Sequence, residues 1–219
     1  MVEQGRIFID RAEAGYELAK LLEAQYKGQN VLVLGIPRGG VVVAYEVARV
    51  LNGELSVVIT KKLPHPRQEE LAIGAVAEDG SVFLSSLAKG ISEQNIDRII
   101  KAQEREIQSH IQRFRKGTAL PQMANRTVII VDDGIATGST IIPAIKLCKH
   151  MKAGRVIVAA PVSGENYIRD IDDLADEVVV AEKPELFYAV GQVYEDFHHL
   201  SDTEVVSLLD DFEKRKNKT

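Results

Sequence analysis

The stretch VIIVDDGIATGST, residues 128–140, decides how the chain is interpreted. Its four β-branched residues, 128–131, are typical of a buried parallel strand. They run directly into the adjacent carboxylates of Asp132 and Asp133, and a loop of small and hydroxyl-bearing residues follows at 134–140. Ligands of open α/β sheets bind beyond the carboxyl ends of the strands. The stretch therefore predicts a binding site at the end of this strand.

The chemistry of the two halves of this stretch favours a sugar phosphate. Adjacent carboxylates need partners, because like charges at short range raise a pKa, and either a divalent cation or two vicinal sugar hydroxyls would suit them. The loop lacks the lysine of a Walker A motif. Its glycines, hydroxyls and following helix N-terminus suit a phosphate group. Taken separately, the aspartates could be a solvated turn or a magnesium-binding pair, and TGST could be a helix cap. The whole pattern favours ribose 5-phosphate.

Strand-like runs alternate with helix-like patterns along the chain, which predicts right-handed crossovers and a mostly parallel sheet. The predicted strands are 31–35, 55–60, 72–77, 81–84, 126–133, 154–162 and 176–181. The predicted helices are 10–26 with Asp10 as N-cap, 41–51, 92–116 with Ser92 as N-cap, and one that ends near residue 151. Segment 61–70, KKLPHPRQEE, is polar and holds two prolines, so we expect no regular structure there.

These elements predict a single α/β domain over residues 1–219. Its mostly parallel central sheet of about five strands, flanked by helices, should occupy residues 28–182. A small hood or cap should come from residues 85–120 and 183–219.

Composition narrows the class of protein. A chain of 219 residues is long enough for one α/β domain. Its net charge of −5 lacks the basic surplus of a general nucleic-acid binder, so no nucleic-acid partner is expected. A single cysteine, Cys148, excludes an intrachain disulfide and fits a reducing compartment. The start MVEQGRIFID is unlike a signal peptide, and no apolar run approaches the roughly 20 residues of a membrane span. We therefore expect a cytoplasmic protein without membrane contact.

The stretch 128–140 resembles the signature with which type I phosphoribosyltransferases bind phosphoribosyl pyrophosphate (PRPP). The resemblance implies that Asp132 and Asp133 hold the ribose 2- and 3-hydroxyls and are the residues nearest a magnesium ion bound with PRPP. It implies that the 5-phosphate lies on the loop of Ala136, Thr137, Gly138, Ser139 and Thr140. Ser139 stands where many members have a second glycine.

Three further segments extend the resemblance over nearly the whole chain. GIPRGG, residues 35–40, looks like the pyrophosphate loop of the family, and residues 61–76 look like its mobile catalytic loop region. FYAVGQVYEDF, residues 187–197, is similar to the hood of purine-type members and of a poorly characterised bacterial and archaeal subgroup. The implied reaction is transfer of ribose 5-phosphate from PRPP to a nucleobase or similar nitrogen acceptor, with release of pyrophosphate.

The leaving pyrophosphate needs cationic partners. Arg38, together with the amides of Gly39 and Gly40, suits this role because a guanidinium fork matches phosphate oxygens; the alternative is a surface residue at a helix start. Lys61 and Lys62 end the strand predicted at 55–60, and strand alternation should direct only one of them to the site. We name Arg38 and Lys62 with the acidic pair as catalytic candidates. The following loop, with His65, Arg67 and Gln68, could close as a lid, although His65 could equally be a solvated loop residue.

The acceptor base needs a flat apolar surface. Phe187, Tyr188 and Val190 could stack against a base, but all three could instead belong to the core. Hypoxanthine–guanine members have an aspartate where this chain has Ala136, so proton chemistry on an oxopurine would need another group. Glu185, Glu195 and Asp196 are candidates that the sequence does not rank.

Two other readings compete with a magnesium-dependent phosphoribosyltransferase. One is a PRPP-binding regulatory protein without transferase turnover. The other is a generic phosphate-binding protein or a subunit like PRPP synthetase, which the short chain and the lack of an ATP motif disfavour.

The resemblance also bears on assembly and backbone. Family members commonly dimerise, and the apolar positions of segment 92–116 need a cover from the chain's own sheet or from a partner, so we expect a homodimer. Family members often hold a non-proline cis peptide in the pyrophosphate loop. We therefore expect Pro37–Arg38, or next Arg38–Gly39, to be cis or strongly non-planar when the site is occupied.

Overall fold

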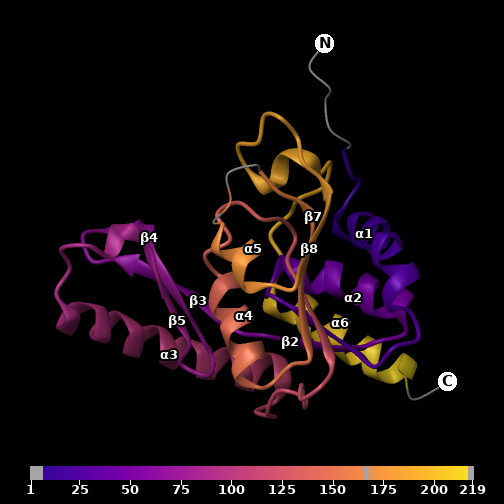
Figure 1. The fold of residues 1–219 in the computed structure, drawn as a ribbon, viewed down its shortest axis with the longest axis horizontal. Coiled ribbons are helices and arrows are strands. Elements are labelled where there is room, and N and C mark those ends of the chain that lie inside the picture. The colour runs from indigo at the N-terminus through magenta and orange to yellow at the C-terminus, as the bar shows by residue number, and fades with distance from the viewer. Residues whose placement is uncertain (1–6, 165–166, 168, 217–219) are drawn as a thin grey trace.

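The fold is built on a parallel sheet of five strands (Figure 1). The computed structural model describes residues 7–164, 167 and 169–216. In spatial order the strands are β2 (Glu54–Val57), β1 (Val31–Gly35), β6 (Thr127–Val131), β7 (Arg155–Val162) and β8 (Glu177–Glu182). Every neighbouring pair in this sheet is parallel. The predicted α/β class with a central parallel sheet is confirmed.

Helices cover both faces of this sheet (Figure 1). One face carries α1 (Arg11–Tyr26) and α2 (Gly39–Leu51), and the other carries α4 (Ile141–His150) and α5 (Asp170–Leu174). Successive side chains of β1 point to opposite faces of the sheet. Val31 and Val33 pack toward α1 and α2, whereas Leu32 and Leu34 pack toward α4. Asp10 caps α1 as predicted, because its carboxylate accepts the amide N–H groups of residues 12 and 13.

A second, antiparallel sheet replaces the irregular segment expected at 61–70. It consists of β3 (Thr60–His65), β4 (Gln68–Ala77) and β5 (Val82–Leu84). The prediction of irregular structure is wrong because β3 is an edge strand, where a residue without an N–H is tolerated. The pairing of β3 with β4 shifts register on both sides of Pro64, so this proline lies at an irregularity in the ladder. The strand predicted at 55–60 is likewise divided between β2 and β3.

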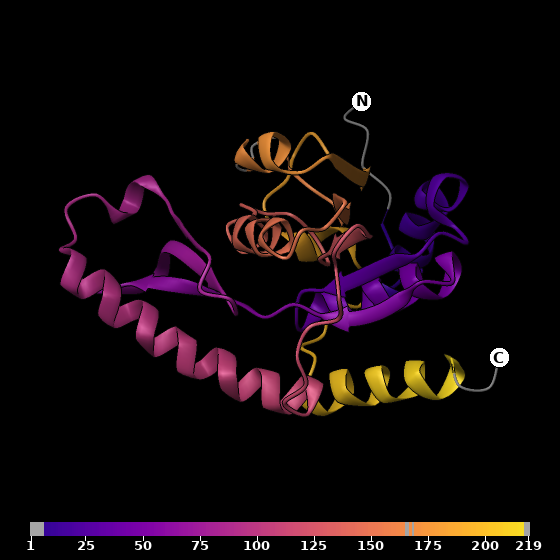
Figure 2. The same cartoon turned by 60° about the horizontal axis from the view of Figure 1, so that its bottom comes forward.

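The long charged helix lies where the sequence predicts it. Helix α3 spans Glu93–Arg115 with Ser92 as N-cap. Its apolar side packs on the second sheet and on α6 (Asp202–Lys216), a helix that the sequence analysis did not identify. Figure 2 shows α3 and α6 along the same side of the molecule. The chain itself therefore covers the isoleucines of α3 at least in part. Ile107 is buried, and Ile96, Ile99, Ile100 and Ile111 are partly buried against the same cluster.

The segment after β8 returns to the start of the chain. Phe8 forms a parallel bridge with Tyr194, and both belong to an apolar cluster with Val162 and Val193. Two short 3-10 turns, η1 (Ser86–Ala88) and η2 (Val190–Val193), complete the elements. Of the segments predicted as a hood, residues 85–120 lie with the second sheet, whereas residues 183–201 lie beside β7 and β8 (Figure 1). Residues 1–6 and 217–219 lie outside the described residues.

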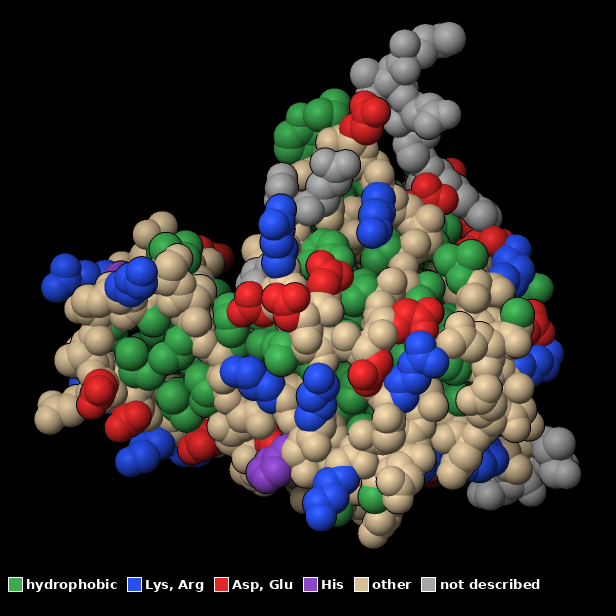
Figure 3. All heavy atoms as spheres, viewed as in Figure 1, with side chains coloured by type: hydrophobic (Ala, Val, Ile, Leu, Met, Phe, Trp, Pro, Cys, Tyr) green, Lys and Arg blue, Asp and Glu red, His purple; other side chains and the backbone are tan. Residues whose placement is uncertain are grey.

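The surface carries charges of both signs. On the face in Figure 3, Lys and Arg side chains are interspersed with Asp and Glu, without a large patch of one sign. Among the residues described, every helix is too short or too polar to cross a lipid bilayer.

Candidate active site

Two loops meet at the carboxyl ends of the central strands. Gly35, the last residue of β1, lies in register with Val131, the last residue of β6. The amide of Ile36 donates a hydrogen bond of 2.9 Å to the carbonyl oxygen of Val131. The predicted pyrophosphate loop at 35–40 and the acidic pair at 132–133 are therefore neighbours, although about a hundred residues separate them in sequence.

Two glycines allow the N-terminus of α2 to pack directly on the acidic pair. A Cβ atom on Gly39 would lie 1.8 Å from Oδ2 of Asp133, and one on Gly40 would lie 2.7 Å from the carbonyl oxygen of Val131. No other residue type fits at such distances. The free amides and positive dipole end of a helix also stabilise nearby carboxylates. These glycines, predicted as pyrophosphate ligands, thus have a packing role as well.

Asp133 is held by a buried ion pair. Nε of Arg11 lies 2.8 Å from Oδ2 of Asp133, and their side chains are only 9% and 17% exposed. The Arg11 guanidinium also donates to the carbonyl oxygen of His198 at 3.0 Å and lies 3.9 Å from the centre of the Phe197 ring. The Tyr194 hydroxyl donates to the backbone carbonyl of Asp133 at 2.6 Å. The first helix and the C-terminal segment together fix this carboxylate.

Arg11 and Tyr194 are not among the site residues predicted from the sequence. Arg11 did carry a signal, since it shares a helical face with the buried residues Ala14, Leu18 and Leu22. A cation on the buried side of an amphipathic helix implies a buried anionic partner. No comparable signal marked Tyr194, whose contact depends on how the C-terminal segment folds back.

Asp132 is the carboxylate that remains available to a ligand. Its Oδ1 accepts the amide N–H of Asp133 at 2.9 Å, and its other oxygen has no hydrogen-bond partner within the described part of the chain. Burial, and then the neighbouring charge of Asp133, raise the pKa of Asp132 well above its usual range, while the charge of Lys62 opposes the shift. A ligand that brings positive charge or hydroxyl donors would relieve this unfavourable environment.

The loop after the acidic pair presents free amides. It begins with a hydrogen bond of 2.8 Å from the amide of Ile135 to the carbonyl of Val162, and Gly138 has a φ of +76° that favours glycine. The amides of residues 136, 137, 138 and 140 donate no hydrogen bond to any residue the structure describes, and that of Ser139 makes only a long contact of 3.4 Å to the Thr137 hydroxyl. Helix α4 starts immediately afterwards. Free amides at a helix N-terminus favour an anion such as a phosphate group, so the structure is compatible with the predicted phosphate site.

A cleft of about 430 Å³ is lined by the second sheet and α3, and also by Pro37 and Thr140 of the two loops. Its lining includes Pro37, Lys61, Lys62, His110 and Thr140. Both Lys61 and Lys62 line this cleft, and the expectation that only one of them faces the candidate site stays a prediction. The Nζ of Lys61 lies 3.4 Å from Nε2 of His110. Burial is the main cause that lowers the pKa of Lys61 and the pKa of His110; nearby cations add to this shift, and the carboxylates of Glu106 and Asp202 oppose it.

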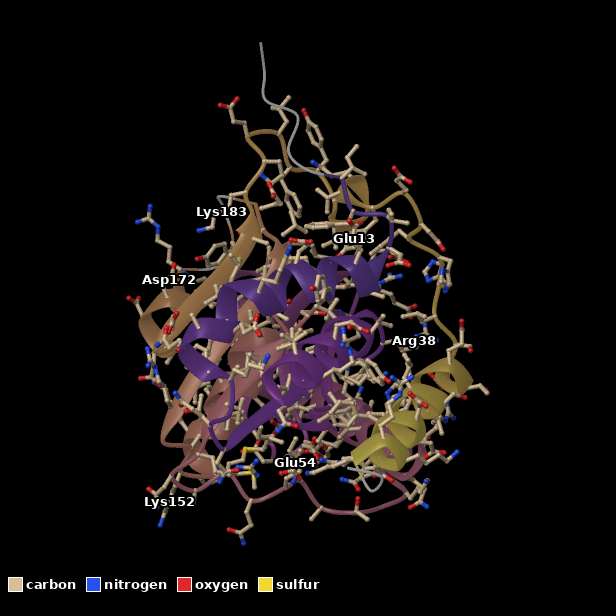
Figure 4. The ribbon with its side chains drawn as sticks, turned by 90° about the vertical axis from the view of Figure 1, so that its right-hand side faces the viewer. Glu13, Arg38, Glu54, Lys152, Asp172 and Lys183 are labelled. Atoms are coloured by element: carbon tan, nitrogen blue, oxygen red, sulfur yellow. The ribbon has the colours of Figure 1, made fainter. Side chains whose placement is uncertain are left out.

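The predicted pyrophosphate loop has an unusual backbone and a half-exposed arginine. The Pro37–Arg38 peptide is cis, which is one of the two bonds named from the sequence. Arg38 lies beside α6 (Figure 4), and its Nη1 is 3.6 Å from Oδ1 of Asp202. The residues predicted to form the lid, His65, Arg67 and Gln68, lie at the tip of the β3–β4 hairpin.

Comparison with known proteins settles the family. The family model described as a phosphoribosyl transferase domain matches residues 9–198. The chain belongs to the phosphoribosyl transferase family. It is 42% identical over 208 residues to two Mycobacterium tuberculosis proteins named "Putative phosphoribosyl transferase" MT0597 and Rv0571c, a match that covers 94% of this chain and 47% of theirs. The chain thus spans about half the length of these curated relatives. The crystal structure of TT1426 from Thermus thermophilus is 37% identical, with a TM-score of 0.79 over 94% of this chain and 99% of that one.

In this member of the family, the three residues predicted to bind the base lie in different surroundings. Val190 packs beside the acidic loop, since a Cβ atom on Gly134 would lie 2.5 Å from its Cγ1. Phe187 packs against Gly164 in the same way. Both Phe187 and Val190 pack against the apolar cluster that contains Phe8 and Tyr194. Tyr188 is 83% exposed. A role for any of them in base binding stays a prediction.

The donor set of this family member suits a magnesium ion that arrives with a phosphate ligand. Within the described ranges, no three His, Cys, Asp or Glu side chains gather as a metal site. Mg²⁺ usually takes one or two carboxylates and completes its shell with substrate phosphates and water. The acidic pair meets that requirement through the unpaired oxygen of Asp132.

Proposed function

We propose that this chain transfers ribose 5-phosphate from PRPP to a nitrogen of a base, with release of pyrophosphate and with Mg²⁺ bound alongside PRPP. One observation carries the proposal: the free amides of residues 136–138 and 140, the available carboxylate of Asp132 and the loop of Arg38 meet at one edge of the sheet. These three features match the phosphate, the ribose hydroxyls and the pyrophosphate of PRPP.

Each part of PRPP then has a partner of suitable chemistry. The amides at the start of α4 would bind the 5-phosphate, because unpaired N–H groups at a helix N-terminus favour an anion. The free oxygen of Asp132 would accept a ribose hydroxyl, and Asp133, held by Arg11, would orient the loop beside it. Arg38, Lys61 and Lys62 would face the pyrophosphate. Phe187, Val190 and Tyr188 remain the candidates for base contact.

The residues around the leaving group would accelerate the reaction by stabilising charge. Departure of pyrophosphate moves negative charge away from the sugar, and preorganised cations lower the energy of that state. A bound Mg²⁺, held by Asp132 and Asp133, would neutralise part of the charge of the pyrophosphate. The carboxylate of Asp132 would hold the ribose as its ring becomes electron-poor.

The family relationship supports transfer over the regulatory alternative. The relatives carry the name "Putative phosphoribosyl transferase", and the family model that matches most of this chain is described as a phosphoribosyl transferase domain. A regulatory protein would bind PRPP through the same residues without releasing pyrophosphate, so turnover distinguishes the two functions.

The test is incubation with PRPP, MgCl₂ and a panel of purine, pyrimidine and other nitrogen bases, with pyrophosphate release and product mass as readouts. We expect release with at least one acceptor and its loss in Asp132→Asn. Asp173→Asn, an exposed carboxylate on α5, is the matched control and should keep full activity. PRPP binding without release would support the regulatory function. Absence of PRPP binding would overturn the proposal.

A further inference from the structure

An acidic residue of α6 joins two arginines from distant parts of the chain. Asp202, the first residue of α6, forms an ion pair with Arg38 of the loop at 35–40. It also accepts a hydrogen bond from Arg113, near the end of α3. The two arginine side chains are 47% and 49% exposed, whereas Asp202 is 24% exposed. Two guanidinium groups thus converge on a single carboxylate.

This cluster lies close to Lys61, one of the residues that line the cleft beside the second sheet. Lys61, which lines the cleft, lies close enough to Arg38, Arg113 and Asp202 for their charges to affect its pKa. Glu106 also acts on Lys61, so the group as a whole contains three cations, Lys61, Arg38 and Arg113, and two carboxylates. The cations come from three different elements, the loop at 35–40, β3 and α3. Such a convergence is typical of an anion site.

The contacts of Asp202 are of the kind that a stronger anion can displace. Exposed ion pairs contribute little to stability, because solvent screens them and the long side chains lose freedom. A carboxylate carries one negative charge, whereas a diphosphate carries more and presents more oxygens to two guanidinium forks. A diphosphate that entered the cleft would therefore compete well for the same donors.

We propose that Arg113 is a further diphosphate-binding residue, and that Asp202 holds Arg38 and Arg113 until the diphosphate of the ligand replaces it. This inference rests on the proposed function, because it concerns the pyrophosphate side of that site. It goes beyond the family resemblance, since Arg113 and Asp202 lie outside the segments 35–40, 61–76, 128–140 and 187–197 that carry it.

A purely structural role makes a different prediction. An acidic residue in the first turn of a helix stabilises that helix, and the ion pair between Lys116 and Asp210 also joins α3 to α6. If Asp202 only fastened α6, its substitution would loosen the helix and would leave diphosphate affinity unchanged or weaker. If the diphosphate instead replaces Asp202 on the two arginines, substitution of Asp202 should strengthen diphosphate binding, because removal of the competing carboxylate frees both arginines.

The test measures binding of inorganic pyrophosphate in MgCl₂ by calorimetry, with ribose 5-phosphate as a second probe. We expect Arg113→Ala to weaken pyrophosphate binding about fivefold to tenfold, which is within the range for loss of one typical hydrogen bond. Asp202→Asn should tighten it about threefold. Arg98→Ala on α3 and Asp210→Asn on α6 remove the same charges elsewhere and should stay within about twofold of the parent. Affinity for ribose 5-phosphate should not change in any variant.

The outcomes separate this inference from the proposed function. If the parent binds neither probe, both fall. Suppose that the parent binds both probes. If Arg113→Ala then binds pyrophosphate as tightly as Arg98→Ala does, only the inference is refuted. The same holds if Asp202→Asn binds pyrophosphate more weakly than Asp210→Asn does. Should Arg113→Ala lower the thermal midpoint markedly, Arg113→Lys replaces it, and partial retention of affinity is then the expected result.

Discussion

The ion pair between Arg11 and Asp133 should be worth more than any exposed pair of the chain. Their atoms approach to 2.8 Å and their side chains are 9% and 17% exposed. At a charge separation of about 4 Å and an effective dielectric constant of about 20, the Coulomb energy is about 4 kcal/mol. Desolvation offsets part of this energy. We therefore expect a coupling free energy of about 2–3 kcal/mol between the two side chains.

A double-mutant cycle measures this coupling. Arg11→Met keeps much of the apolar stem but leaves Asp133 without its cation, and it also removes the bond to His198 and the stacking on Phe197. We expect it to lower the free energy of unfolding by about 3–4 kcal/mol. Asp133→Asn and the double variant complete the cycle. The assay is urea unfolding at pH 7 and physiological salt without magnesium.

Arg155 and Glu177 provide the matched control. Their separation is also 2.8 Å, but the side chains are 41% and 30% exposed. The corresponding cycle, with Arg155→Met and Glu177→Gln, should give a coupling below about 1 kcal/mol. A coupling for Arg11 and Asp133 no larger than that of the control would refute the view that burial makes this pair a fixed support of the site.

The remaining predictions concern charge, backbone and assembly. Asp132→Asn should weaken PRPP binding by about 1–3 kcal/mol. Burial raises the pKa of Asp132 in the folded state, so the folded protein loses stability as the pH rises from the pKa of the unfolded chain through the folded pKa. Without magnesium at pH 7, Asp132→Asn should therefore unfold at a higher urea concentration than the parent. This difference should disappear in acid, where the parent carboxyl group is protonated. Gly138→Ala should lower the free energy of unfolding by about 1–3 kcal/mol and weaken ribose 5-phosphate binding, since φ is +76° and the new Cβ would lie 2.3 Å from Ile171. Gly80 is the control, because its φ of +84° is similar but its surroundings are open. Gly80→Ala should lower stability less and leave ribose 5-phosphate binding unchanged. Because the pKa of His110 is lowered in the folded state, the unfolded state binds the His110 proton more readily, and the stability of the parent should fall as the pH drops below about 6.5. In His110→Asn, the urea midpoint of unfolding should depend less on pH over this range. Light scattering at micromolar concentration should give the mass of a homodimer, and a monomer mass would contradict that expectation.

Much of the fold could be predicted because the relevant signals are local. A run of apolar residues marks β1 at Val31–Gly35, and Asp10 before an amphipathic pattern marks the start of α1. The stretch 128–140 contains its own strand, carboxylates, loop and helix start, so its chemistry could be interpreted without any distant partner. Each of these features depends on neighbours within a few residues, which is the range over which sequence patterns are informative.

Other features depend on which distant segments pack together. A pattern of prolines suggested irregular structure at 61–70, but pairing with β4 and the edge position of β3 override that local preference. Asp133 was recognised as a candidate ligand from its own segment, whereas its cation, Arg11, lies 122 residues away. Arg113 and Asp202 are separated by 89 residues and meet only because α3 and α6 pack against one another. The sequence alone determined which chemical groups stand at the end of β6. Only the tertiary structure decided which charges surround them, because an ion pair depends on the positions of two side chains and the packing of whole helices sets those positions.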